Sequence, residues 1–237
     1  MIAEPKPMAQ LMLSDGPTLS IDLRRSSRAR RLTLRVSQLD GRVTLTLPTS
    51  VSECEALQFA QSKEAWLRTH LERFEGIVQV EFGTSLPFEG KPIRVMPGTG
   101  RRITQSPDEI HVPGPAEHVG RKLQVFLKTR ARDRLAEASD LYAGRLGKAF
   151  SGLTLRDTRS RWGSCTSKGR IMYSWRLILA PPGILEYVAA HEVAHLEQMN
   201  HSPAFWALVE QIHGDYRQPR AWLRANGASL HRYRFAD

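Results

Sequence analysis

The chain has 237 residues, of which 41% are apolar, and its formal net charge is +10 at pH 7. This length and composition predict one large or two small globular domains with a hydrophobic core. The two distant cysteines, Cys54 and Cys165, exclude a disulfide framework and agree with a reducing cytoplasm, and no stretch approaches the roughly 18 consecutive apolar residues of a membrane span.

The first part of the chain is predicted to be rich in strands. Residues 1–15 are expected to be loosely ordered, and a single helix is predicted over about 51–74, capped by Ser50 or Ser52. Alternation of apolar and polar residues, broken by proline and glycine, predicts the strands. These strands cover residues 19–25, 31–36, 43–47, 77–82, 91–96, 101–104 and 109–113.

A predicted boundary between two parts of the chain lies in the breaker-rich segment Pro107–Pro115. The first part, 16–115, is a β-rich subdomain with one helix. The second part, 116–237, starts with apolar residues at helical spacing up to Gly147, which is compatible with one long helix or two.

An arginine cluster occupies a dozen residues of the first part and consists of Arg24, Arg25, Arg28, Arg30, Arg31 and Arg35. One interpretation is a solvated strand face, and the alternative is a nucleic-acid contact surface. The cluster contains no aromatic residue, so a platform for base stacking is not supported.

Two further strands are predicted before the next helix, over Leu153–Thr158 and Ile171–Leu179. They are joined by a polar, glycine-containing segment and are expected to form a hairpin. A strand beside the helix that follows could hold an extended peptide by edge pairing. A cleft of peptide width along residues 171–175 would favour proteolysis, whereas a closed, arginine-lined pocket would favour a phosphorylated small molecule.

The residues His191-Glu192-Val193-Ala194-His195 form an H-E-x-x-H motif, and His201 follows six residues later. Apolar residues at helical spacing predict a buried helix from Pro181–Pro182 to about Asn200, and Ser202–Pro203 predicts the start of the next helix.

On a helix, residues four apart lie on one face, so His191 and His195 can bind one metal ion together. Glu192 points about 100° round the helix and can contact a metal-bound water. This pattern indicates a zinc hydrolase with a glutamate general base. His201, between two helices, can supply a third nitrogen and leave one tetrahedral position open. We therefore expect one Zn²⁺ per chain.

Other assignments around the motif are less specific. Glu210 and Asp215 are candidates for the acceptors that orient the histidines, although their spacing in the sequence does not place them. Trp162 and Cys165 are interpreted as packing residues near the site, since free cysteine is commonly a small buried hydrophobe; for Cys165, a fourth zinc ligand and a redox-sensitive lid are alternatives. The candidates for stabilising the oxyanion or contacting substrate are Tyr173, Tyr187, His213, Tyr216 and Arg217.

A resemblance to a known family is carried by residues 161–206, which read RWGSCTSKGRIMYSWRLILAPPGILEYVAAHEVAHLEQMNHSPAFW. This stretch resembles the YgjP-like metallopeptidases, which belong with the SprT-like and WLM zinc peptidases. The resemblance implies an α+β, zincin-like fold, in which an active-site helix packs against a small sheet. It also implies His191, His195 and His201 as metal ligands and Glu192 as the catalytic residue. The family name gives no substrate, and relatives in the wider group cut proteins crosslinked to DNA.

One departure concerns the metzincins, whose motif H-E-x-x-H-x-x-G-x-x-H shares this histidine spacing. Gln198 replaces the glycine of that motif. We therefore expect the chain to turn at Asn200 and to have no methionine turn.

Three functions are compatible with these observations. The first is a zinc endopeptidase that attacks an extended peptide with a water activated by Glu192. A protease that acts on nucleic-acid-bound proteins is a variant of this first function. The second is a hydrolase of a non-peptide substrate such as a nucleotide phosphoanhydride. The third is a binding module with a vestigial metal site, and the intact Glu192 argues against it.

Overall fold

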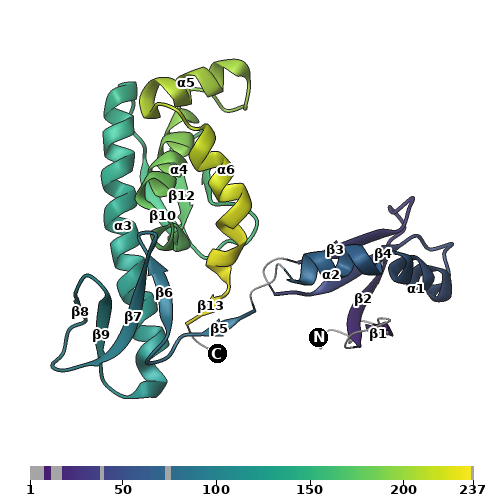
Figure 1. Ribbon diagram of the computed structural model, residues 1–237. Helices are drawn as coiled ribbons and strands as arrows, with labels where there is room; N and C mark the ends of the chain where they lie inside the picture. The colour runs from purple at the N-terminus through teal and green to yellow at the C-terminus, as the bar shows by residue number, and fades with distance from the viewer. Residues whose placement is uncertain (1–7, 12–17, 38–39, 73–75, 236–237) are drawn as a thin grey trace. The chain divides into compact units, whose positions relative to one another are not determined.

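The structure is a computed structural model that describes residues 8–11, 18–37, 40–72 and 76–235. The chain divides into two compact units, Met1–Ile77 and Val78–Asp237 (Figure 1). The division differs from the predicted boundary at 115/116. The physical reason is that strand residues such as Val95 share one hydrophobic core with the following long helix.

The first unit contains a four-stranded sheet in the order β1-β2-β4-β3, in which β2 and β4 are parallel and the other pairs are antiparallel. The predicted strands 19–25 and 43–47 are confirmed, and the strand predicted over 31–36 begins at residue 33. The bounds are Met8–Leu11 for β1, Leu19–Arg25 for β2, Thr33–Val36 for β3 and Val43–Leu47 for β4.

The expectation of a loosely ordered segment over 1–15 is wrong for β1, which pairs with β2 in regular register. The remaining residues of that segment, 1–7 and 12–15, lie outside the described residues.

The helix predicted over 51–74 is two helices, α1 (Glu53–Ser62) and α2 (Glu64–Glu72). Ser52 and Glu55 form a reciprocal capping box that starts α1. The helices separate at Lys63, whose backbone leaves helical geometry. Buried residues of both helices, including Ala60 and Leu67, join the sheet residues in one core.

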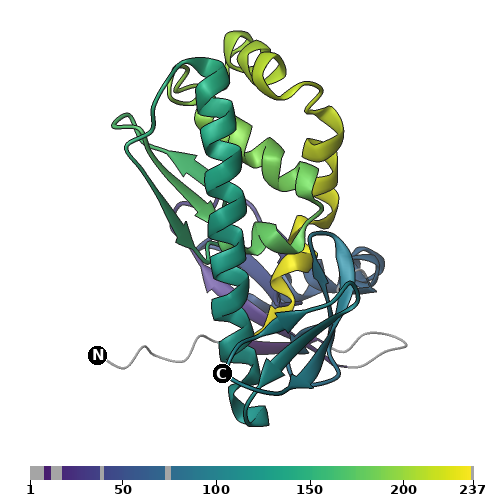
Figure 2. The same cartoon turned by 90° about the vertical axis from the view of Figure 1, so that its left-hand side faces the viewer.

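The second unit is organised around α3 (Val119–Leu146), a single helix of 28 residues that runs the length of this unit (Figures 1 and 2). One of its sides carries a four-stranded sheet in the order β6-β7-β9-β8. The strands predicted at 91–96 and 109–113 are confirmed, β6 was not predicted, and the strand predicted at 101–104 lies at 104–105. The bounds are Ser85–Phe88 for β6, Lys91–Gly98 for β7, Thr104–Gln105 for β8 and Glu109–Pro113 for β9.

The strand predicted over 77–82 is reduced to β5 (Val78–Gln79). It pairs with β13 (Tyr233–Arg234), close to the end of the chain. This parallel pairing joins the first and last parts of the second unit.

A three-stranded sheet lies next to the helix that carries the H-E-x-x-H motif and has the order β10-β12-β11. The predicted hairpin is wrong, because β10 (Gly152–Arg156) and β12 (Arg170–Ser174) are parallel. The hairpin is formed instead by β11 (Gly163–Cys165) and β12. Residues Trp175–Leu179 form a buried 3-10 helix rather than a continuation of the strand.

The last helices are α4 (Pro182–Ala194), α5 (Pro203–His213) and α6 (Arg217–Asn226). The starts of α4 and α5 agree with the predictions. The chain leaves the helix at His195, before the predicted end near Asn200, and α6 was not predicted. Within the described ranges, no helix combines the length and apolar character that crossing a bilayer requires.

Candidate metal centre

Three histidines converge where α4 ends and α5 begins. The ring centroid of His191 lies 5.1 Å from that of His195 and 5.0 Å from that of His201, and the last two are 4.8 Å apart. One nitrogen from each ring lies within 4.8 Å of the others. Among the described residues, this is the only group of three or more potential metal-binding side chains that close together.

The spacing of the ring nitrogens fits a shared cation. The Nε2 atoms of His191 and His201 are 3.0 Å apart, and two nitrogens on a tetrahedral zinc ion are about 3.3 Å apart. Burial and the neighbouring histidines lower the pKa of His191 to about 3, and burial also lowers the pKa of His195. Both rings are therefore neutral at pH 7, which is the form that binds metals.

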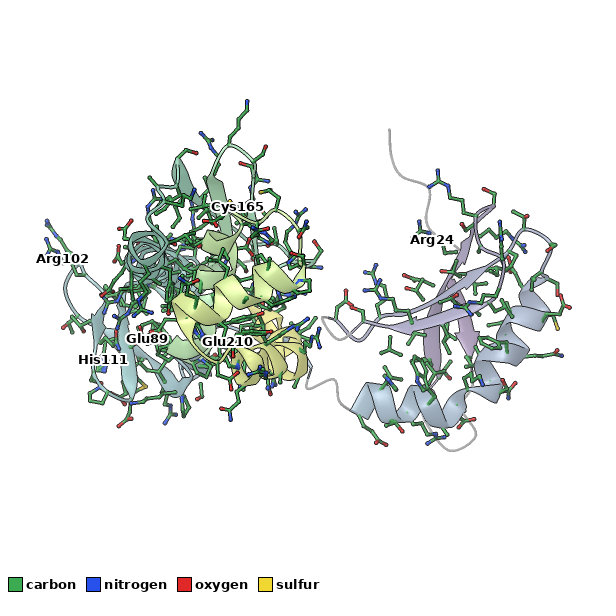
Figure 3. All side chains as sticks on the ribbon, turned by 90° about the horizontal axis from the view of Figure 1, so that it is seen from above. Arg24, Glu89, Arg102, His111, Cys165 and Glu210 are labelled. Carbon is green, nitrogen blue, oxygen red and sulfur yellow. The ribbon has the colours of Figure 1, made fainter. Side chains whose placement is uncertain are left out.

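A hydrogen bond in the turn after α4 fixes the tautomer of His195. Its Nδ1 lies 2.8 Å from the carbonyl oxygen of Gln198, so Nδ1–H donates and Nε2 keeps its lone pair. The candidate acceptors Glu210 and Asp215 do not orient His195. The carboxylates of both residues pair with Arg217 instead. Glu210, which lies on α5, is labelled in Figure 3.

Glu192 is buried directly beside the histidines. Burial raises the pKa of its carboxyl to about 8, and the charge of Arg161 opposes this effect. A bound divalent cation would favour the carboxylate again. Glu192 also borders a cavity of about 230 Å³ whose lining comprises Gly163, Ser164, Cys165, His191, Glu192, His195, Met199 and His201.

The free strand edge at this cavity is β11. A peptide cannot pair with residues 171–175, because β12 is paired on both sides, with β10 and with β11. Of the two outer strands of this sheet, β10 and β11, only β11 lines this cavity, and its outer edge can accept another strand.

Comparison with known proteins bears on this arrangement. A family model described as YgjP-like, metallopeptidase domain, matches residues 30–226. The chain belongs to the YgjP-like family. It is thus a metal-dependent peptidase that acts on peptide or protein substrates, and its α+β architecture agrees with the expected zincin-like fold.

A solved structure and the curated proteins add two findings about this YgjP-like protein. The crystal structure of the metallopeptidase zymogen of Pyrococcus abyssi abylysin is similar, at 22% identity and a TM-score of 0.35, over 39% of this chain and 92% of that chain. No curated protein matches the sequence.

Cys165 of the YgjP-like protein, labelled in Figure 3, is half-buried and lines the cavity beside the histidines. Its sulfur is not part of the histidine group. Burial raises the pKa of its thiol to about 11, so without a metal ion beside it the thiol carries a proton at neutral pH.

The five candidate oxyanion or substrate contacts occupy different environments. Tyr173 is fully buried and its hydroxyl is 3.0 Å from Ser139 Oγ, so it cannot contact substrate. Tyr216 stacks on Trp206, and His213 lies against Tyr142 and Tyr187. Arg217 is held in ion pairs. Of the five, Tyr187 lines a cavity together with the histidines, with its ring 6.0 Å from that of His191.

That second cavity contains residues that sequence reasoning missed. Its volume is about 620 Å³, and it includes two arginines of α6, Arg220 and Arg224. Their four-residue spacing places them side by side on a helix, but the sequence analysis did not predict helix α6, so the pair was not recognised. The full lining comprises Trp162, Tyr187, His191, His201, Trp206, Arg220, Leu223 and Arg224.

The arginine cluster belongs to the first unit, and all six of its side chains are exposed, including Arg24 (Figure 3). Arg25 donates to the carbonyl oxygen of Val51 and pairs with Glu53. These contacts agree with a solvated strand face, and the comparisons give no support for nucleic-acid binding.

Proposed function

We propose that this protein is a zinc-dependent endopeptidase whose ion is held by His191, His195 and His201. The observation that carries the proposal is the convergence of three imidazole nitrogens within 4.8 Å of one another, beside a buried glutamate. Three neutral nitrogen ligands leave a fourth position for water, as in catalytic rather than structural zinc sites.

Each residue of the site has a proposed role. When bound, zinc would lower the pKa of a water molecule to near 7 and polarise the peptide carbonyl. Glu192 takes the proton of that water and passes it to the leaving amine. Gln198 holds His195 in the metal-binding tautomer through its backbone carbonyl. Tyr187 is the candidate donor to the oxyanion because it lines a cavity beside the histidines.

An extended peptide fits the free edge of β11. Peptide backbones bind such edges by adding a strand, and Gly163 has no side chain that would block the approach to Glu192. Cavities of about 230 and 620 Å³ share His191 and His201. Substrate residues on both sides of the cleaved bond can therefore be accommodated. For this reason we propose cleavage within a chain rather than at its end.

The experiment compares the wild-type protein with Glu192→Gln and His195→Ala, using casein as substrate and elemental analysis for metal. We expect about one zinc per chain in the wild type and in Glu192→Gln, with turnover only in the wild type. His195→Ala should lose both. Casein cleavage that persists in Glu192→Gln, or in the presence of a chelator, would contradict the proposal.

A second candidate function is hydrolysis of a nucleotide phosphoanhydride. It is favoured by the positions of Arg220 and Arg224 beside the histidines, since guanidinium groups bind phosphates well. Against it, phosphate chemistry more often uses carboxylate-rich magnesium sites. Incubation with nucleoside triphosphates under the same conditions separates the two activities.

A further inference from the structure

The cavity of about 620 Å³ adjoins the histidine cluster through His191 and His201. Its walls combine three kinds of side chain. Trp162 and Trp206 supply aromatic surface, Leu223 supplies aliphatic surface, and α6 supplies two cations. Any group that leaves the metal site on this side enters a space that is both apolar and positively charged.

The two cations carry charge that faces the cavity. Arg220 and Arg224 lie four residues apart, on one face of α6. In the part of the chain that the structure describes, no carboxylate forms an ion pair with either of them, whereas Arg217 on the same helix pairs with Glu210 and Asp215. The charge that faces the cavity is therefore available to a ligand.

Arg220 is also held in a defined orientation. The centre of its guanidinium group lies 4.2 Å from the ring centroid of Trp206. Stacking on an aromatic ring limits the motion of the planar group and leaves its edge free to donate hydrogen bonds. A planar donor of this kind matches the two oxygens of a carboxylate.

The edge strand β11, which is proposed to pair with the substrate peptide, leads to this cavity. Trp162 lines the cavity and directly precedes β11, and its carbonyl oxygen accepts a hydrogen bond from the backbone nitrogen of Ser174. A peptide paired with β11 would direct alternate side chains to opposite faces. One of these side chains, close to the cleaved bond, would then point toward the two arginines.

We propose that this cavity is a specificity subsite that selects an acidic side chain, aspartate or glutamate, next to the cleaved bond. The inference rests on the proposed peptidase function. Apolar walls contact the methylene groups of the side chain, and Arg220 and Arg224 bind its carboxylate. The corresponding amide, glutamine, has the same shape but lacks the charge.

The test uses matched quenched peptides that differ only by Glu or Gln at one position at a time on either side of the cleaved bond. At the position that enters the subsite, we expect kcat/KM to be at least about tenfold higher for Glu, since hydrogen bonds to charged groups are the stronger ones. Binding of the same peptides to zinc-loaded Glu192→Gln provides a measurement that does not depend on turnover, and the same preference is expected in Kd.

Substitutions in α6 test whether the preference for Glu over Gln comes from the two arginines. Arg224→Gln should lower the Glu/Gln ratio, because one of the two cations is lost, and Arg224→Glu should lower it further, because the new carboxylate neutralises Arg220. Arg220→Lys retains the charge but loses the planar group, so it should lower the ratio less. Arg217→Gln is the matched control, because its charge is already paired, and it should keep the wild-type ratio.

The outcomes separate this inference from the proposed function. Chelator-sensitive cleavage with a Glu/Gln ratio near one, or with a ratio unchanged in Arg224→Gln, overturns the subsite and leaves the peptidase. Absence of any peptide cleavage overturns the peptidase, and binding to Glu192→Gln then decides the subsite. Stronger competition by inorganic pyrophosphate than by the Glu peptide would assign the cavity to phosphates and overturn the inference.

Discussion

Gly163 lies directly against the carboxylate of Glu192. A β-carbon built on Gly163 would overlap the Oε1, Cγ and Cδ atoms of that side chain. The edge strand β11 can thus approach α4 only because this position has no side chain. Gly163 therefore controls both the orientation of the proposed general base and the space in front of it.

The first prediction concerns this contact. Gly163→Ala should lower kcat/KM for peptide cleavage by about 100-fold or more, because a displacement of about 1 Å in a catalytic group can cost that much. The metal content should stay at that of the wild type, since the histidines are not displaced directly. Gly152→Ala on β10 is the control, because an added β-carbon there meets nothing within 4 Å. Equal losses in both variants would contradict this reading.

The second prediction concerns the third histidine. His201→Ala removes one of three ligands, so zinc affinity should fall by at least about tenfold, and zinc should no longer raise the melting temperature as it does for the wild type. Competition with a chromophoric chelator measures the affinity. His118→Ala, which removes an exposed histidine before α3, should bind zinc as the wild type does. Unchanged affinity in His201→Ala would exclude it as a ligand.

The third prediction concerns pH and His231, which is buried with its ring 5.1 Å from that of Trp162. Burial, followed by the charge of Arg176, lowers the pKa of His231 to about 4. The unfolded chain takes up this proton below about pH 6.5, and the folded chain only near pH 4. The free energy of unfolding should therefore fall as the pH drops through this window, by up to about 3 kcal/mol.

His231→Phe tests this assignment because it keeps an aromatic ring and removes the titrating group. Urea unfolding at pH 7 and at pH 5 should show a smaller loss of stability in the variant than in the wild type. Parallel losses in the two proteins would assign the pH dependence to other groups.

The fourth prediction concerns Arg176, whose side chain is buried. Its Nε and Nη2 atoms lie 2.7 and 3.1 Å from the two carboxylate oxygens of Asp157, and Nη1 donates to the carbonyl oxygens of Leu230 and Tyr233. Arg176→Met should destabilise the protein by about 1–3 kcal/mol, because the carbonyl groups of Leu230 and Tyr233 lose their donor. Chemical denaturation measures this change, and the exposed Arg156→Met should change stability by less than about 1 kcal/mol.

The fifth prediction concerns the two units. Among the residues that the structure describes, no residue belongs to both hydrophobic cores: the first extends from Leu11 to Leu71 in the chain, and the second from Val80 to Phe235. A fragment of residues 78–237 should therefore fold and bind one zinc ion. Near-ultraviolet circular dichroism and metal analysis of the fragment check this. An unfolded fragment would show that the second unit depends on the first.

Much of the local structure could be predicted from the sequence because it depends on neighbouring residues. The four-residue spacing of His191 and His195 places them on one helical face wherever that helix packs. Ser202 and Pro203 start α5 by local hydrogen bonding and by a fixed φ angle. Alternation with a period of two likewise identified β2 and β4.

Tertiary structure alone decided the rest. Which strand is central and which is at the edge depends on long-range pairing, and a period of two does not specify the partner, so β11 was not identified as the free edge. The acceptor for His195 is the backbone carbonyl of Gln198, a group that every residue has and that no side-chain pattern reveals. Arg220 and Arg224 reach the histidines only because α6 packs beside α4. The sequence thus specifies the chemistry of the metal site, and the packing of distant segments determines what surrounds it.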